Sequence, residues 1–293
     1  MELLNSRMSL LGSDYGTGST GLMSDPSDSF RSFGNRFPEQ AYSARYEYAA
    51  LFAAISAIGV TNWDWGNSGF RFNNEGWFNE ENTASGGMDK LGHAFTGYLM
   101  SDMLTWAIRN HSKDPRRGEI SGALLSFSLM TYIDVLDGFS SDHGFSYEDL
   151  LMSAAGASFS ALRNSFPELK EKVDFRMQYL PSRYSSFEPL GDYEGQKYFL
   201  ILKLAGFESL RNTPLKYVEL HGGYYARGYS REERAANAKR EQNLYVGIGV
   251  NLSELLFGEK SSKDHWSEKA GRTTLEYIQI PYTYASAGGT SGR

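Results

Sequence analysis

Two hydrophobic periods divide the chain, and the first is helical. Up to about residue 166, apolar residues recur every three to four positions in runs rich in alanine and leucine, as in helices that pack in a bundle. The run after Ser146 also has a capping-box pattern, in which Asp149 would reach back to the backbone amide of the N-cap residue. We therefore predict about four helices, near residues 41–60, 88–110, 117–136 and 146–166.

After Pro181 the period changes from helical spacing to alternation. Residues 243–252 place Leu244, Val246 and Ile248 on one face and Tyr245 on the other, which is typical of a strand. Similar patterns predict strands at 197–206, 215–229 and 274–284. The sequence thus predicts an α+β fold, with an N-terminal bundle of about four helices followed by an antiparallel sheet of four to six strands.

The segments around these elements set the predicted domain borders. Residues 1–40 are rich in Ser, Gly, Asp and Asn and predict a flexible N-terminal arm, and the sequence SAGGTSGR predicts a disordered tail at 286–293. Between them we expect a helical bundle domain at 41–180 and an antiparallel β-rich domain at 181–285. An aromatic loop that contains Trp63 and Trp65 is predicted as a hydrophobic plug over the bundle or as a binding lip.

Composition and charge narrow the possible partners. The 293 residues carry 29 Lys and Arg against 35 Asp and Glu, a net charge of −6 without a basic block, so we expect no nucleic-acid partner. The absence of cysteine excludes thiolate metal sites, disulfides and thiol nucleophiles. The 19 Tyr, 18 Phe and 31 Gly are common where strands meet a membrane interface or a glycan, although a large soluble β domain also carries them.

Ionisable side chains gather at the start of the second predicted helix. Asp89, Lys90 and His93 fall in its first turn, where the helix dipole favours an anion and the spacing puts Lys90 and His93 on one side. A phosphate or carboxylate could bind there, with His93 as a proton donor or acceptor. In the alternative interpretation, Asp89 caps the helix and His93 forms a hydrogen bond within the core.

Two carboxylates close the third predicted helix. Asp134 and Asp137 lie near its C-terminus, where the dipole disfavours negative charge, so a divalent cation, Lys90 or His93 could compensate them. The candidate metal ligands are accordingly Asp134, Asp137 and His93. Among the polar residues nearby, Asp149 is predicted to cap the following helix together with Ser146. Asp142 and His143 lie in the loop before this cap. Glu75, Glu80 and Glu81 precede the second helix and are predicted to be solvated.

Several catalytic motifs are missing from the sequence. No G-x-S-x-G elbow, phosphate-binding P-loop or G-x-G-x-x-G follows a predicted strand, so serine-hydrolase, nucleotide and dinucleotide chemistry have no support. His221 and His265 stand alone in the β half and are assigned no role.

Five segments of the chain together resemble a known family, namely FRFNNEGWF, GGMDKLGHAFTGY, YIDVLDGFSSDHGFSYEDL, MQYLPS and DYEGQKYFL. This is a bacterial family of predicted cell-envelope lipoproteins with a domain of unknown function. The resemblance covers most of residues 65–280, and its DK-x-x-H piece is also similar to the opening of VanZ-like helical membrane proteins. It implies an exported protein at an envelope membrane, periplasmic or associated with the outer membrane. The motif positions that it implies are Lys90, His93, Asp137, Gly138 and Asp149.

This resemblance supplies a location and no reaction. A lipoprotein needs a lipidated cysteine, and the sequence has none, so the leader that carries it is missing here or the anchor is different. The family has no established activity to carry over, and whether the protein is an enzyme stays open.

Three functional hypotheses follow from these residues. In the first, an envelope protein binds or processes a phosphorylated lipid or glycan in a polar pocket at the helix ends, with His93 as acid/base, Lys90 as anion clamp and Asp137 as the residue that orients His93 or binds a divalent metal. In the second, a non-catalytic scaffold uses the same residues as a buried ion-pair network. In the third, the sheet binds a glycan or a partner strand through Tyr224, Tyr225 or Tyr245. The expected partners are a membrane surface, an envelope lipid or glycan, or another envelope protein.

Overall fold

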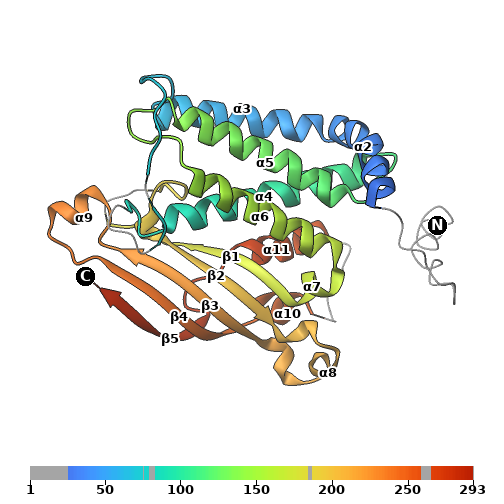
Figure 1. Cartoon of the computed structure of the whole chain (residues 1–293). Coiled ribbons are helices and arrows are strands. Elements are labelled where there is room, and N and C mark those ends of the chain that lie inside the picture. The colour runs from blue at the N-terminus through green and yellow to red at the C-terminus, as the bar shows by residue number, and fades with distance from the viewer. Residues whose placement is uncertain (1–25, 75, 79–82, 184–186, 259–264, 293) are drawn as a thin grey trace, which may run out of the picture. The chain divides into compact units, whose positions relative to one another are not determined.

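The structure is a computed structural model that describes residues 26–74, 76–78, 83–183, 187–258 and 265–292. Contacts divide the chain into two compact units, Met1–Pro38 and Glu39–Arg293. Helix α2 (Pro26–Ser43) begins in the first unit and ends in the second. The helices of the second unit (Figure 1) are α3 (Arg45–Asn62), α4 (Met88–His111), α5 (Gly118–Asp137), α6 (Tyr147–Ser165), α7 (Pro167–Lys172), α8 (Glu208–Arg211), α9 (Arg231–Ala235), α10 (Leu252–Phe257) and α11 (Trp266–Tyr277).

Helix α4 is the centre of the helical layer and packs against both α5 and α6. Small residues allow this close approach. A Cβ atom at Gly156 in α6 would lie 1.8 Å from the carbonyl oxygen of Ala94 in α4. A Cβ atom at Gly97 in α4 would lie 2.7 Å from the carbonyl oxygen of Ser153 in α6. Ser153 and Gly156 therefore lie on the surface of α6 that contacts α4.

Helix α5 is, within the described residues, the one helix that is long and apolar enough to cross a membrane by length and composition. Its buried residues include Leu129, Met130 and Ile133, which form a hydrophobic cluster with Leu104 and Ile108 of α4. Helix α5 also packs against α6, so part of its apolar surface lies in contacts between helices.

The sheet is a five-stranded antiparallel meander in the order β1-β2-β3-β4-β5. Its strands are β1 (Val173–Tyr179), β2 (Gln196–Lys203), β3 (Val218–Arg227), β4 (Glu241–Val250) and β5 (Tyr284–Gly292), and its short 3₁₀ turns are η2 (Tyr193–Gly195), η3 (Leu204–Gly206) and η4 (Pro214–Tyr217). The predicted α+β fold, with helices first and an antiparallel sheet after them, is confirmed.

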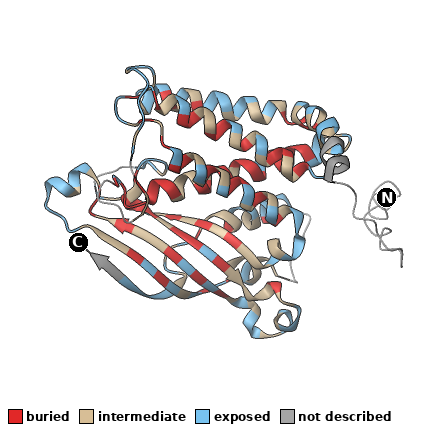
Figure 2. Cartoon of the chain, viewed as in Figure 1, coloured by how far each residue is buried: buried red, intermediate tan, exposed pale blue. Residues whose placement is uncertain are grey.

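Aromatic residues join the helical layer to one face of the sheet. The ring of Phe95 in α4 lies 5.6 Å from that of Phe175 in β1 and 5.9 Å from that of Tyr198 in β2. Phe159 of α6 and Tyr224 of β3 pack against the same cluster. The buried positions in Figure 2 accordingly concentrate in α4 and in the strands next to it.

The structure differs from the predicted domain borders at both ends. Residues 26–40 of the predicted flexible arm belong to helix α2, in which Phe33 and Phe37 lie one turn apart with ring centroids 5.8 Å from each other. The sequence did not predict this helix because Pro38 lies inside it and because most of its residues are polar, so the helical spacing of apolar residues is weak. The predicted disordered tail at 286–293 instead contributes to β5, because backbone hydrogen bonds to β4 need no particular side chains.

The β domain also begins earlier than the sequence predicts, and its last strand lies after the predicted strand at 274–284. Strand β1 lies inside the predicted helical domain at 41–180. The sequence did not predict this strand because its buried positions, Asp174, Arg176 and Gln178, are polar. The predicted strand at 274–284 is mostly wrong, because Trp266–Tyr277 forms helix α11. Only Ile278 pairs with β1 there, in an isolated bridge to Met177.

Candidate functional site

The polar cluster predicted from the sequence lies where the start of α4, the end of α5 and the start of α6 meet. Helix α4 begins after Gly86 and Gly87, whose φ angles of 64° and 85° are in the left-handed region that glycine adopts readily. This turn places Asp89 and Lys90 in the first helical turn and buries both.

Lys90 is fully buried and is held by two carboxylates. Its Nζ lies 2.8 Å from Oδ2 of Asp89 and 3.0 Å from Oδ1 of Asp149 in α6. Ser85 donates a hydrogen bond to the other oxygen of Asp89, and its own Oγ accepts one from the Asp89 backbone amide at 3.2 Å. The charge of Lys90 is therefore compensated inside the protein, so this geometry does not favour the predicted clamp for an external anion.

Ser146 caps helix α6, but Asp149 takes a different role from the one predicted. The Ser146 hydroxyl accepts a hydrogen bond from the Asp149 backbone amide at 3.3 Å. In place of the predicted reciprocal bond from Asp149, the Ser146 hydroxyl donates to the buried carboxylate of Glu148 at 3.0 Å, while the Asp149 carboxylate pairs with Lys90. Asp149 thus links α6 to α4.

His93 lies one turn after Lys90 and faces the end of α5. Its Nδ1 is 3.5 Å from Oδ1 of Asp134 and 3.4 Å from Oγ of Ser153. Burial on its own lowers the pKa of His93, but the carboxylates of Asp149, Asp134, Asp89 and Asp137 together raise it above its ordinary value. The surrounding carboxylates therefore favour the protonated form of the imidazole.

Asp134 is the most perturbed carboxyl group of the cluster. Burial raises its pKa from 3.8 to about 7, His93 and Lys90 oppose this rise, and Asp149 and Asp137 add to it. Its Oδ2 is buried and has no hydrogen-bond partner among the described residues. A carboxyl group in this state can exchange a proton near neutral pH.

Asp137 lies at the last residue of α5 and is oriented by a tryptophan. The Trp65 indole donates a hydrogen bond to Oδ1 of Asp137 at 2.6 Å. Burial raises the pKa of Asp137, while the hydrogen bond from Trp65 and the nearby imidazoles of His143 and His93 lower it, with a raised pKa as the result. Trp63 and Trp65 pack on the hydrophobic cluster of α4 and α5, as the plug interpretation predicts.

The remaining predicted residues lie around this cluster or outside it. Asp142 and His143 occupy the loop between α5 and α6, which Arg71 holds through the carbonyl oxygens of Ser140 at 2.9 Å and His143 at 3.0 Å. Glu75, Glu80 and Glu81 lie outside the described residues. Among the described residues, no group of three or more His, Asp or Glu side chains has the arrangement that would hold a metal ion. The ligand set of Asp134, Asp137 and His93 stays a prediction.

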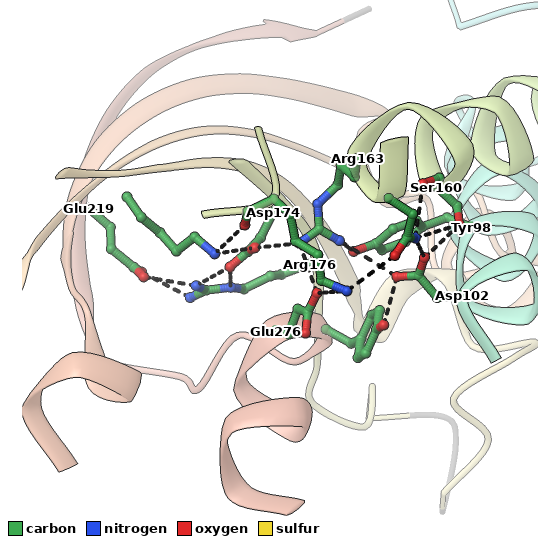
Figure 3. A network of polar contacts seen from close by, with 12 residues as sticks. Tyr98, Asp102, Ser160, Arg163, Asp174, Arg176, Glu219 and Glu276 are labelled. Carbon is green, nitrogen blue, oxygen red and sulfur yellow. Dashed lines mark hydrogen bonds and ion pairs between the residues drawn. The ribbon is translucent and has the colours of Figure 1, made fainter. Parts of the chain in front are cut away.

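A second buried network, which the sequence did not predict, joins the helices to the sheet (Figure 3). Arg163 in α6 is fully buried, and one of its terminal nitrogens lies 3.0 Å from Asp174 in β1 and 2.8 Å from Glu276 in α11. Its other terminal nitrogen donates to the Tyr98 hydroxyl in α4 and lies 3.6 Å from Asp102. One guanidinium therefore connects four elements.

The network continues along the opposite face of the sheet from the helices. Arg176 in β1 forms two parallel hydrogen bonds with Glu219 in β3, at 2.9 and 2.8 Å, and also pairs with Asp174 at 2.6 Å. Lys203 in β2 lies 2.6 Å from Asp174. Burial on its own raises the pKa of Asp174, but Lys203, Arg176 and Arg163 outweigh it and the pKa is lowered. The sequence signal for this network is the polar alternation of β1.

A cavity of about 520 Å³ opens beside this second network. Charged residues of both signs line it, among them Lys170, Asp174, Arg176, Lys203 and Glu276. Several of these charges already pair with one another across the cavity wall, Lys170 with Glu276 and both Arg176 and Lys203 with Asp174.

Comparison with known proteins finds a family model that matches the segment with the first cluster. Residues 74–165, which contain Lys90, His93, Asp134, Asp137 and Asp149, match the family model of DUF2279, described as a predicted periplasmic lipoprotein. No curated protein and no solved structure matches the chain. The match confirms the resemblance to predicted envelope lipoproteins over these residues, whereas the VanZ-like similarity of the DK-x-x-H piece stays a prediction. The helical segment that carries the polar cluster is therefore similar to DUF2279, a predicted periplasmic lipoprotein family of unknown function.

Proposed function

We propose that the protein is a non-catalytic structural protein of the bacterial envelope, in which the DUF2279 segment is a rigid frame. The observation that carries this proposal is the position of Lys90, which is fully buried between Asp89 and Asp149. A buried cation with two carboxylate partners fixes the register of α4 against α6, and it leaves no charge free for a substrate. The periplasmic description of the family supports an envelope location.

The frame extends to the sheet through Arg163. Because this residue contacts α4, β1 and α11 together, the two buried networks join the helical layer and the sheet into one rigid body. The protein would then act by presenting a surface to an envelope partner, rather than by turning over a substrate.

A double-mutant cycle at Lys90 and Asp149 tests the structural role. Lys90→Met leaves two carboxylates buried without their cation and should lower the free energy of unfolding by about 3–5 kcal/mol. Asp149→Asn in the Lys90→Met background removes one of these charges. The double variant should therefore lose less free energy of unfolding than the two single variants lose together. Urea unfolding of the four proteins measures the coupling, and additive losses would contradict the proposed network.

A second candidate function is acid/base chemistry at His93, Asp134 and Asp137. The observation in its favour is the pKa of Asp134, raised to about 7, beside an imidazole at 3.5 Å. In this hypothesis His93 or Asp134 transfers the proton during hydrolysis or transfer on a phosphorylated lipid or glycan, and Asp137 orients His93.

Thermal shift distinguishes the two candidates. The native protein and its Asp137→Asn variant are melted with Mg²⁺, Mn²⁺, Zn²⁺ or glycerol phosphate, since any ligand of the folded state raises Tm by mass action. Stabilisation of the native protein alone would favour the acid/base site. A lower Tm of the variant without an effect of any ligand would favour the frame.

A further inference from the structure

The two faces of the sheet have an unusual distribution of polar and apolar residues. The strand register places alternate residues on opposite faces. On the face away from the helices, charged and polar residues are buried, namely Asp174, Arg176, Gln178, Glu219, His221 and Asn243. On the face toward the helices, six aliphatic side chains are 41–70% exposed, namely Leu200, Leu220, Leu244, Val246, Ile248 and Val250. We call this second set the aliphatic face.

The aliphatic face continues the surface on which the helices pack. Phe175 and Tyr198 belong to the same face and are covered by Phe95 of α4. Beyond them the helices leave the face open, and a hollow of about 910 Å³ lies on it, lined by aliphatic residues that include Leu202 and Ala285. The open part therefore has the composition of a covered hydrophobic interface.

No described residue on this face carries a charge, from Val173 in β1 to Gly289 in β5. Strands with buried polar residues on one face and aliphatic residues on the exposed face have the alternation of strands that face lipid. A protein partner of ordinary composition would be expected to meet a polar rim with hydrogen-bonding side chains. An uncharged aliphatic surface complements hydrocarbon instead.

Two exposed tyrosines lie at one end of the strands that form this face. Tyr217 precedes Val218 in β3, and Tyr282 precedes β5 and is 94% exposed. The two lie at the same strand end, because the backbone amide of Val250 bonds to the carbonyl oxygen of Thr283 at 3.0 Å and that of Asn251 to the carbonyl oxygen of Tyr217 at 2.8 Å. Exposed tyrosines beside an apolar surface are typical of the boundary between hydrocarbon and headgroups.

We propose that the aliphatic face of the sheet docks on the acyl-chain layer of a phospholipid membrane. The run from Leu244 to Val250 covers six residue steps of about 3.3 Å, or about 20 Å, which is less than the roughly 30 Å of a bilayer core. The face is therefore too short to span the membrane and enters it from one side. Tyr217 and Tyr282 lie at the level of the headgroups. This inference goes beyond the proposed frame and does not depend on it.

Vesicle flotation of the full chain tests the docking surface. The wild-type protein is mixed with phosphatidylcholine vesicles, which carry no net charge, so that only apolar contact drives binding. We expect the protein to float with the vesicles and the double variant Val246→Glu/Ile248→Glu to lose at least about tenfold in partitioning, because charges replace two exposed aliphatic groups that docking would bury in the acyl chains. The matched control is Leu124→Glu/Leu151→Glu, which changes two exposed aliphatic residues of α5 and α6 and should float like the wild type.

A labelled single cysteine keeps the test valid if the double variant does not fold. The chain has no cysteine, so Val246→Cys can carry one environment-sensitive fluorophore, and Val60→Cys on α3 provides the control position. Vesicles should shift the emission to the blue at position 246 and leave it unchanged at position 60. Absence of wild-type flotation, or equal flotation of the sheet variant, would overturn the proposal. So would a dimer in light scattering that the sheet substitutions dissociate, since a second copy would then cover the face.

Discussion

Arg163 and Asp174 form a buried ion pair of 3.0 Å between the end of helix α6 and the start of strand β1. In the sequence, the short helix α7 connects α6 to β1. The ion pair adds a direct contact between the last turn of α6 and the first residues of β1. Asp174 also accepts contacts from Lys203 and Arg176, which extend the same network over three strands through Glu219 (Figure 3). The junction between helices and sheet is therefore electrostatic as well as aromatic.

Removal of Arg163 should destabilise the whole fold. Arg163→Met keeps most of the side-chain volume but leaves Asp174, Glu276 and Asp102 with fewer cationic partners in a buried position. We expect the free energy of unfolding to fall by about 3–5 kcal/mol in urea titrations. Arg109→Met is the matched control, because Arg109 forms an exposed ion pair with Glu119 and its loss should change stability by less than about 1 kcal/mol. Equal effects of the two substitutions would refute the role given to Arg163.

The clearest strands and helices could be predicted because one pattern governs each of them. Helices α4, α5 and α6 and strands β2, β3 and β4 lie close to their predicted positions, since long apolar runs with a constant period leave few alternatives. Strand β1 and helix α11 break this rule. The buried face of β1 is polar, and the alternation of Ile278 and Ile280 after α11 imitates a strand over too short a length.

The candidate site was predictable in its members and not in their pairing. Lys90, His93, Asp134 and Asp149 come from three helices, and the sequence places them at helix ends that could meet. It does not show that Asp149 turns away from its own N-cap toward Lys90, because that choice depends on the distance between α4 and α6. Arg163 was missed for the same reason, since its partners lie on α4, β1 and α11.

The raised pKa of Asp134 predicts a specific pH dependence of stability. The folded-state pKa is about 7, against 3.8 without burial, so the folded protein binds this proton more tightly than the unfolded chain does. The corresponding stabilisation is complete below about pH 4 and is lost as the pH rises through 7, with a total of about 4 kcal/mol for three pK units. His93, whose pKa is also raised, adds a loss of the same sign as the pH rises above 6.5.

Asp134→Asn removes the first of these titrations and therefore isolates it. Urea unfolding from pH 4.5 to 7.5 should show that the wild type loses stability relative to the variant as the pH rises. Asp89, Lys90 and His93 on α4, Asp137 on α5 and Asp149 on α6 stay in place in both proteins, so their other titrations largely cancel. Asp142→Asn, on the exposed loop after α5, should retain the wild-type slope. Parallel stability curves for the wild type and Asp134→Asn would show that Asp134 titrates normally.

The close contact of α4 and α6 makes Gly156 a sensitive position. A methyl group there would lie 1.8 Å from the carbonyl oxygen of Ala94, so Gly156→Ala forces the two helices apart. Overpacking of this kind costs about 1–3 kcal/mol, and the better helix propensity of alanine returns at most about 1 kcal/mol. We expect a Tm several degrees lower, since each kcal/mol shifts Tm by about 2–4 °C in a domain of this size. Gly34→Ala in α2 is the control, because a methyl group there meets no atom within 4 Å and should leave stability unchanged or slightly higher.

A separation of α4 from α6 also lengthens the Lys90–Asp149 contact, so Gly156→Ala should reduce the coupling energy between these two residues. Unchanged coupling would show that the pair does not depend on the spacing of the two helices.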